Sequence, residues 1–245
     1  MADRATFSVL DPQKVVATIG MLQKRIEERF AGSGLANVCG ELQAIAATNT
    51  QRAEKIARGN TVLRAGIFAL LLLGIAAIVW IITLIHSYST TADNIYSVLQ
   101  GIEAAANLAV LIGAALFFLV RSEERLKRRE ALTALHELRS IVHVIDMHQL
   151  TKDPSADDNS IGGKTSSSPP RILSRYLLAR YLDYSSEMVS LTSKVAVLFS
   201  QSFPDPDIID AVSDIERIAA GLSQKIWQKI MILELQGNMM PATGS

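Results

Sequence analysis

The 245-residue chain contains little cysteine, proline, glycine or charge. Its single cysteine, Cys39, excludes an intramolecular disulfide framework. Seven prolines and 14 glycines leave little room for a turn-rich all-β fold. Charged residues make up 20%, below the share of about 25% in soluble domains. Because 24 Lys and Arg balance 24 Asp and Glu, the overall charge does not point to a nucleic-acid partner.

The apolar residues are concentrated in two long runs. Residues 65–85 read AGIFALLLLGIAAIVWIITLI, and residues 104–120 read AAANLAVLIGAALFFLV. A helix needs about 20 apolar residues to cross a bilayer core of about 30 Å. We therefore expect membrane spans at about 65–86 and 100–120. The alternative for the first run is a buried helix of a soluble protein. A signal peptide does not fit, because about 60 residues precede the run.

The charges around these runs predict an orientation. No Lys or Arg occurs from His86 to Glu103, whereas both outer flanks are basic. The positive-inside rule then places both termini in the cytoplasm and a short connector outside, as in a multi-pass protein of the cell inner (plasma) membrane. Cys39 would lie on the reducing side.

Helical spacing of apolar residues organises the rest, so we expect an all-α integral membrane protein with a two-helix transmembrane hairpin and a cytoplasmic helical bundle. Asp11 with Pro12, and Asp205 with Pro206, have the form of a helix start. The predicted segments are N-terminal helices at 1–60, a transmembrane hairpin at 61–121, an extension of the second span at 122–150, a flexible linker at 151–170, a helical hairpin at 171–236 and a disordered tail at 237–245. The C-terminal hairpin carries heptad seams, the first formed by Leu177, Tyr181, Tyr184, Met188, Leu191, Val195 and Leu198.

A polar stripe on the extension is the strongest candidate for a ligand or gating site. At 100° per residue, His136, Arg139, His143 and Asp146 share one sector, and His148 follows them. The stripe could be a hydrated surface or polar packing within the bundle. It could also bind a small anionic ligand through Arg139 and the imidazoles, hold a metal, or respond to pH. Metal binding is disfavoured, because zinc usually needs three or four protein ligands.

The second span carries small and polar residues. Gly101, Ala105, Ala109 and Gly113 recur every four residues and predict close helix packing, within one subunit or between subunits. Gly66 and Gly74 leave similar notches in the first span. Asn107 and Glu103 are candidates for a functional role, because polar groups at membrane depth cost energy.

Three hypotheses for function follow. The first is a homo-oligomer whose cytoplasmic domain gates or organises a small pore, since two spans cannot enclose a path alone. The second is a non-conducting membrane-anchored scaffold that binds cytoplasmic partners. The scarce polarity of the spans favours such a scaffold or a hydrophobically gated pore. An enzyme is the weakest, because we find no catalytic motif, and we expect no cofactor. The expected partners are membrane lipid, further copies of the chain and a small anion. Trp227 lies beside its seam and could reach another subunit.

The layout of residues 12–150 also resembles small two-span bacterial effectors of the SLATT type. Those families place a helix, a membrane hairpin and a long cytoplasmic helix in this order. The resemblance implies a nucleotide-responsive defence effector that forms pores. It does not extend to the C-terminal hairpin.

Overall fold

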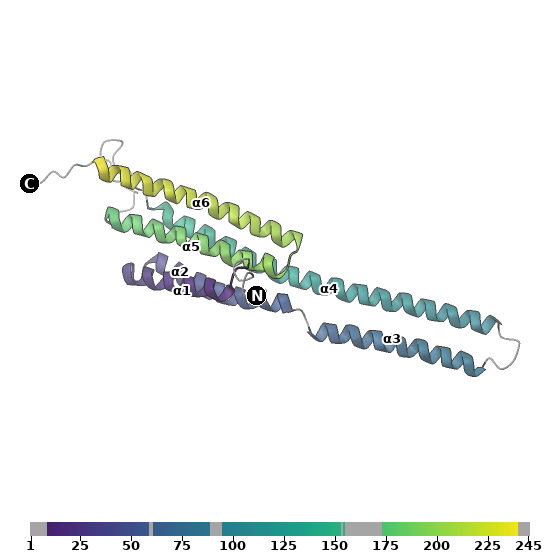
Figure 1. Cartoon of the computed structure of the whole chain (residues 1–245). Helices are drawn as coiled ribbons and strands as arrows, with labels where there is room; N and C mark the ends of the chain where they lie inside the picture. Colours follow the sequence, from purple (N-terminus) through teal and green to yellow (C-terminus); the bar gives the residue numbers. More distant parts are fainter. Residues whose placement is uncertain (1–8, 59–60, 89–94, 153, 155–172, 240–245) are drawn as a thin grey trace, which may run out of the picture. The chain divides into compact units, whose positions relative to one another are not determined.

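The computed structural model describes residues 9–58, 61–88, 95–152, 154 and 173–239. In these residues the fold is all-helical, without strands (Figure 1). The six helices are α1 (Pro12–Arg29), α2 (Gly34–Arg58), α3 (Thr61–Tyr88), α4 (Ile95–Leu150), α5 (Arg175–Ser202) and α6 (Pro206–Met239). The predicted linker lies outside the described residues except at 151, 152 and 154. Helix α6 continues to Met239, so residues 237–239 are helical and do not belong to the predicted disordered tail.

The chain divides into two compact units. The bundle unit comprises 1–57 and 130–245, and the hairpin unit comprises 58–129. The boundary falls inside α4, a single helix of 56 residues. Its uninterrupted course follows from the sequence, because no Gly or Pro occurs between Arg121 and Leu150.

Side-chain caps start three helices of the bundle unit. Asp11 Oδ1 accepts a hydrogen bond from the backbone nitrogen of Gln13 at 2.9 Å, and Pro12 begins α1. Asp205 does the same for the backbone nitrogen of Asp207 at 3.0 Å, and Pro206 begins α6. Ser174 caps α5. Such caps satisfy backbone donors that have no partner within the helix. The two Asp-Pro starts were predicted, and the Ser174 cap was not.

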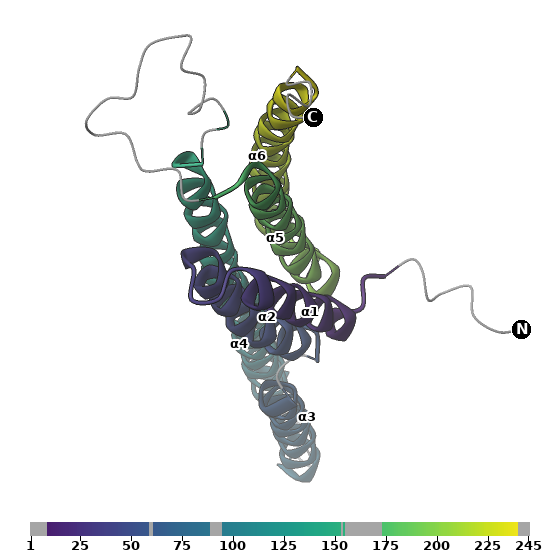
Figure 2. The same cartoon turned by 90° about the vertical axis from the view of Figure 1, so that its left-hand side faces the viewer.

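Helix α5 forms the centre of the bundle core and packs most closely against α6 and α1 (Figure 2). Its predicted seam is buried from Tyr181 to Leu198. A second buried seam, one residue further along, was not predicted. Its members are Leu178, Leu182, Ser185, Val189, Thr192, Ala196 and Phe199. Helix α5 is therefore enclosed on two faces, whereas a surface helix has one apolar stripe.

The hairpin unit pairs α3 with the N-terminal part of α4. Both helices are long and apolar enough to cross a membrane by length and composition, and only 6% and 0% of their most apolar stretches is buried. The alternative of a soluble protein requires these helices to be buried in its core. In the described residues they are not buried. Within residues 65–83 and 99–120, the residues that are at least partly buried are Ile67, Leu70, Gly74, Ala77, Ile78 and Ile81 on α3, and Gly101, Ala105, Leu108, Ile112, Leu116 and Leu119 on α4.

Candidate functional site

The polar stripe of α4 does not form one site. His136, Arg139 and His143 are exposed, and Asp146 and His148 are partly buried. Of these five residues, only His143 and Asp146 line either of the two grooves described below. The stripe divides because His143 and Asp146 lie at the groove between α4 and α6, whereas His136 and Arg139 are exposed outside it.

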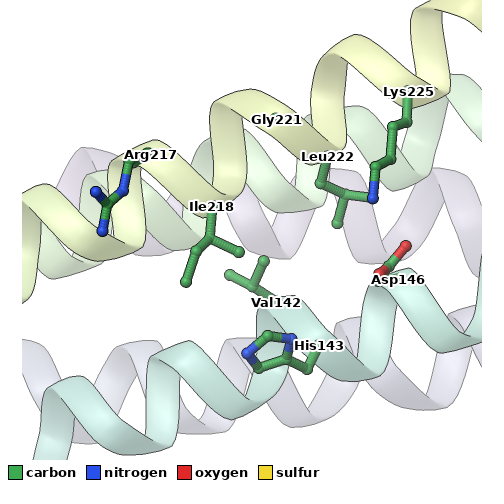
Figure 3. A pocket seen from close by; sticks show the side chains of 8 residues that line it. All are labelled: Val142, His143, Asp146, Arg217, Ile218, Gly221, Leu222 and Lys225. Atoms are coloured by element: carbon green, nitrogen blue, oxygen red, sulfur yellow. The ribbon is translucent and has the colours of Figure 1, made fainter.

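The α4–α6 groove is a depression of about 300 Å³ between the two helices (Figure 3). Helix α4 contributes His143 and Asp146, and helix α6 contributes Arg217 and Lys225. The remaining lining residues are Val142, Ile218, Gly221 and Leu222. The ammonium group of Lys225 points towards Asp146, and His143 lies below Ile218. The groove thus combines polar ends with an apolar middle, a pattern typical of small-molecule sites.

Asp146 is held in place from its own helix. Its Oδ1 accepts a hydrogen bond from Gln149 Nε2 at 2.8 Å. The backbone oxygen of Gln149 in turn accepts one from Lys229 Nζ of α6 at 2.9 Å. These bonds fix the Asp146 end of the groove and tie α4 to α6.

His148 belongs to a different contact. It packs against Gly34 at the start of α2, where an added Cβ would come within 2.6 Å of His148 Cε1. Glycine therefore permits this approach, and His148 takes no part in the groove. No group of three His, Cys, Asp or Glu side chains in the described part of the chain could hold a metal ion.

A charged and aromatic cluster joins α1 to α5, and the sequence did not indicate it. The guanidinium of Arg25 forms a two-point ion pair with Glu187 and lies 5.7 Å from the ring centre of Tyr184. Arg29 donates to the Tyr176 hydroxyl at 3.1 Å. Only the i, i+4 spacing of the two arginines could have suggested a common face. Such bidentate and stacked contacts fix the register of the two helices.

Cys39 lies beside this cluster and is fully buried. Burial raises the pKa of its thiol to about 12, an effect that Arg25 reduces and Glu187 reinforces. Since the thiolate is the reactive form, Cys39 is suited to packing in the core.

A second groove, of about 420 Å³, lies between α5 and α6 beside α1. Trp227 and Ile230 of α6 face Leu191 and Lys194 of α5 across it. Trp227 is 60% exposed. Its contact with another subunit therefore stays a prediction.

The small residues of the hairpin unit have unequal roles. Gly74 meets α4, because an added Cβ would lie 2.5 Å from Ile112 Cδ1. Gly66 and Gly113 have nothing within 4 Å of that position. Gly101 and Ala105 lie partly buried on the α3-facing side, whereas Ala109 and Gly113 are exposed. Residues four positions apart differ by about 40° around a helix. Successive members of the row from Gly101 to Gly113 therefore turn away from α3.

The outer seam of α4 lies opposite that contact. Its members are Glu103, Asn107, Val110, Ala114, Phe117 and Arg121, and all are exposed. Their spacings of 4, 3, 4, 3 and 4 residues form a heptad pattern. Nine residues separate Glu103 from Ile112, which places them on opposite sides of a helix at about 100° per residue. Asn107 and Glu103 therefore face away from α3.

Comparisons with known proteins do not assign this chain to a family: no family model, curated protein or solved structure matches it. The resemblance to SLATT-type proteins stays a prediction from layout alone.

Proposed function

We propose that the protein is a homo-oligomeric membrane protein in which the outer seam of α4 packs against the same seam of other copies and lines a small pore. The observation that carries the proposal is the exposure of Asn107 on the side opposite α3. A side-chain amide facing lipid leaves its donors and acceptors without partners, which is costly. In a symmetric assembly the amide can bond to its copies.

The heptad pattern supports the choice of a second copy as the partner. A single Asn within an apolar seam specifies register and oligomer state in coiled coils. Asn107 follows Leu99 by eight residues, or about 12 Å along a helix. Glu103 would then lie near one mouth of the pore and Arg121 near the other.

The composition of the seam favours a hydrophobic gate. Val110, Ala114 and Phe117 occupy the stretch between the polar ends. An apolar constriction closes a pore to ions by excluding water. Because α4 continues without a break into the bundle unit, a rearrangement of the bundle can reach the seam through a rigid helix.

The charge distribution supports an orientation with both termini in the cytoplasm of a cell whose inner (plasma) membrane holds the hairpin. The connector between the spans has no Lys or Arg, and the segment after the second span begins with Arg121, Arg125 and Lys127. Positive residues are retained on the cytoplasmic side.

A non-conducting scaffold is the second candidate. It is favoured by the apolar majority of the outer seam and by exposed apolar side chains on α6, such as Trp227 and Leu235. A scaffold would use the same self-association to present bundle surfaces to cytoplasmic partners.

The experiment is mass measurement of the full chain in lipid nanodiscs, for the wild type and Asn107→Leu. We expect the wild type to be a multimer. The variant should associate roughly threefold to thirtyfold less well, from about 0.6–2 kcal/mol per interhelical hydrogen bond. Leu72→Ala, at an exposed position of α3, is the control and should assemble normally. A wild-type monomer would remove the pore and the seam together.

Ion flux into liposomes then separates the two candidates. A pore should pass ions under some condition of pH or ligand, and Phe117→Ser should increase the flux by wetting the constriction. An oligomer that passes no ion in either form would favour the scaffold.

A further inference from the structure

Gly221 of α6 is a glycine that packing within the chain does not require. An added Cβ there would meet no atom within 4 Å. Gly34 and Gly74 are different, since His148 and Ile112 occupy the space beside them. Glycine inside a helix is destabilising relative to alanine, and it is used where another group approaches the backbone closely. The open space at Gly221 is the floor of the α4–α6 groove.

Two basic side chains lie on either side of Gly221 along the helix. Arg217 lies four residues before Gly221 and Lys225 lies four residues after it. Since i and i+4 positions share a face, Arg217, Gly221 and Lys225 lie on the same side of α6. Ile218 is partly exposed and provides most of the apolar surface between the charges, whereas Leu222 and Val142 are 4% and 1% exposed and lie at its base (Figure 3).

We propose that the α4–α6 groove binds a small phosphate monoester with a flat apolar body. The phosphate group lies at the Arg217 end, where the guanidinium fork and the His143 ring face it. The apolar body lies across Gly221 and against Ile218. Planar guanidinium groups suit phosphate oxygens because they can donate two parallel hydrogen bonds.

The carboxylates near the groove determine which end takes the phosphate. Asp146 and the ammonium group of Lys225 share one end of the groove, so their charges offset each other there and that end suits a hydroxyl or amino group of the ligand. Asp214 Oδ1 accepts one hydrogen bond from Arg217 Nη2 at 2.6 Å. Arg217 is a five-donor group, so donors remain for a ligand. The exposed Arg217–Asp214 pair is also of a weak kind.

The site lies within the bundle unit and does not rest on the proposed assembly. A soluble metabolite or the headgroup of phosphatidic acid could supply the phosphate monoester. The probes are therefore phenyl phosphate, inorganic phosphate and nanodiscs with phosphatidic acid.

Isothermal titration of the full chain in zwitterionic nanodiscs tests the site with phenyl phosphate. We expect saturable binding, stronger than that of inorganic phosphate because the ring covers the apolar floor. Arg217→Leu should weaken it about tenfold or more, the factor of one charge-assisted contact. Gly221→Leu should abolish it by filling the floor. Lys14→Leu removes the same charge from the exposed face of α1 and should change nothing.

The thermal unfolding midpoint of each variant shows that the fold is intact, and Gly221→Ala should raise it. Binding that occurs only in nanodiscs with phosphatidic acid, and that both groove variants lose, would support the site and identify lipid as the source. The absence of saturable binding for all three probes would overturn the proposal. Binding that survives both Arg217→Leu and Gly221→Leu would overturn it as well.

Discussion

Helix α4 belongs to two units, and its apolar side chains are exposed in one unit and buried in the other. In the hairpin unit, Phe117 and Phe118 are 69% and 68% exposed. In the bundle unit, Leu135, Leu138 and Ile145 of the same helix are at most 2% exposed. An exposed helix surface as apolar as that of the hairpin is typical of a surface that lipid or another chain covers. The bundle, in contrast, covers its seams with its own helices.

The largest expected effect comes from comparing two phenylalanines. Phe199→Ala opens a cavity in the bundle core, where Phe199 is 1% exposed. It should lower the free energy of unfolding by about 3–5 kcal/mol. Phe117→Ala should leave the unfolding of the bundle unchanged, because its side chain packs outside that core. Urea unfolding followed by Trp227 fluorescence, with Trp80 replaced by Phe, measures both. Equal losses would show that the two units do not differ in this way.

A smaller effect distinguishes the two glycines of the hairpin. Gly74→Leu pushes against Ile112 and should destabilise the α3–α4 pair by about 1–3 kcal/mol, the usual cost of overpacking. Gly113→Leu adds the same atoms in open space and should leave that pair intact. Denaturation in detergent, followed by Trp80 fluorescence in a Trp227→Phe background, reports on this unit. If Gly113→Leu proved the more harmful, the observed contact face would be wrong.

In the bundle, Gly221→Ala should stabilise α6 by about 0.5–1 kcal/mol, since alanine restricts the unfolded chain and meets no neighbour. Gly40→Ala is the matched control. Its added Cβ would lie 3.0 Å from Gln23 Nε2, so the gain should be smaller. Thermal unfolding of both variants measures the difference. A loss of stability in Gly221→Ala would mean that the groove is more closed than described.

The smallest effect at neutral pH concerns Cys39. Its thiol pKa rises from 9.0 to about 12 on folding, so the folded state favours the protonated form. The stabilising contribution is complete below pH 9 and is lost as the pH rises towards 12. Cys39→Ala should lack this alkaline decline. At pH 8 a thiol reagent should label Cys39 only when the bundle unfolds, and rapid labelling of the folded protein would contradict the burial.

Much of the helical organisation followed from local patterns. Asp11 with Pro12, and Asp205 with Pro206, marked two helix starts because caps act within one turn. The seam from Tyr181 to Leu198 was visible in its spacing. The second seam of α5 was missed, because Ser185 and Thr192 read as polar. Their hydroxyls bond to the carbonyl oxygens of Tyr181 and Met188, which lets them lie in the core.

The candidate sites could be predicted only in part. His143 and Asp146 were recognised from α4 alone, but Arg217 and Lys225 lie more than 70 residues further along the chain. No spacing rule connects residues on helices whose packing is unknown. The same limit applied to Asn107, whose polarity was visible in the sequence. Its direction became known from the position of Ile112 against Gly74.

By itself, the sequence determined that the chain is helical, where two apolar helices lie and where α1 and α6 start. These properties depend on hydropathy, periodicity and caps, which act over a few turns. The tertiary structure decided that α5 is covered on two faces, that the α4 stripe divides, that Asn107 is exposed and that an added Cβ at Gly221 would meet no atom. Those outcomes depend on which helices pack together, and such contacts join residues far apart in the chain.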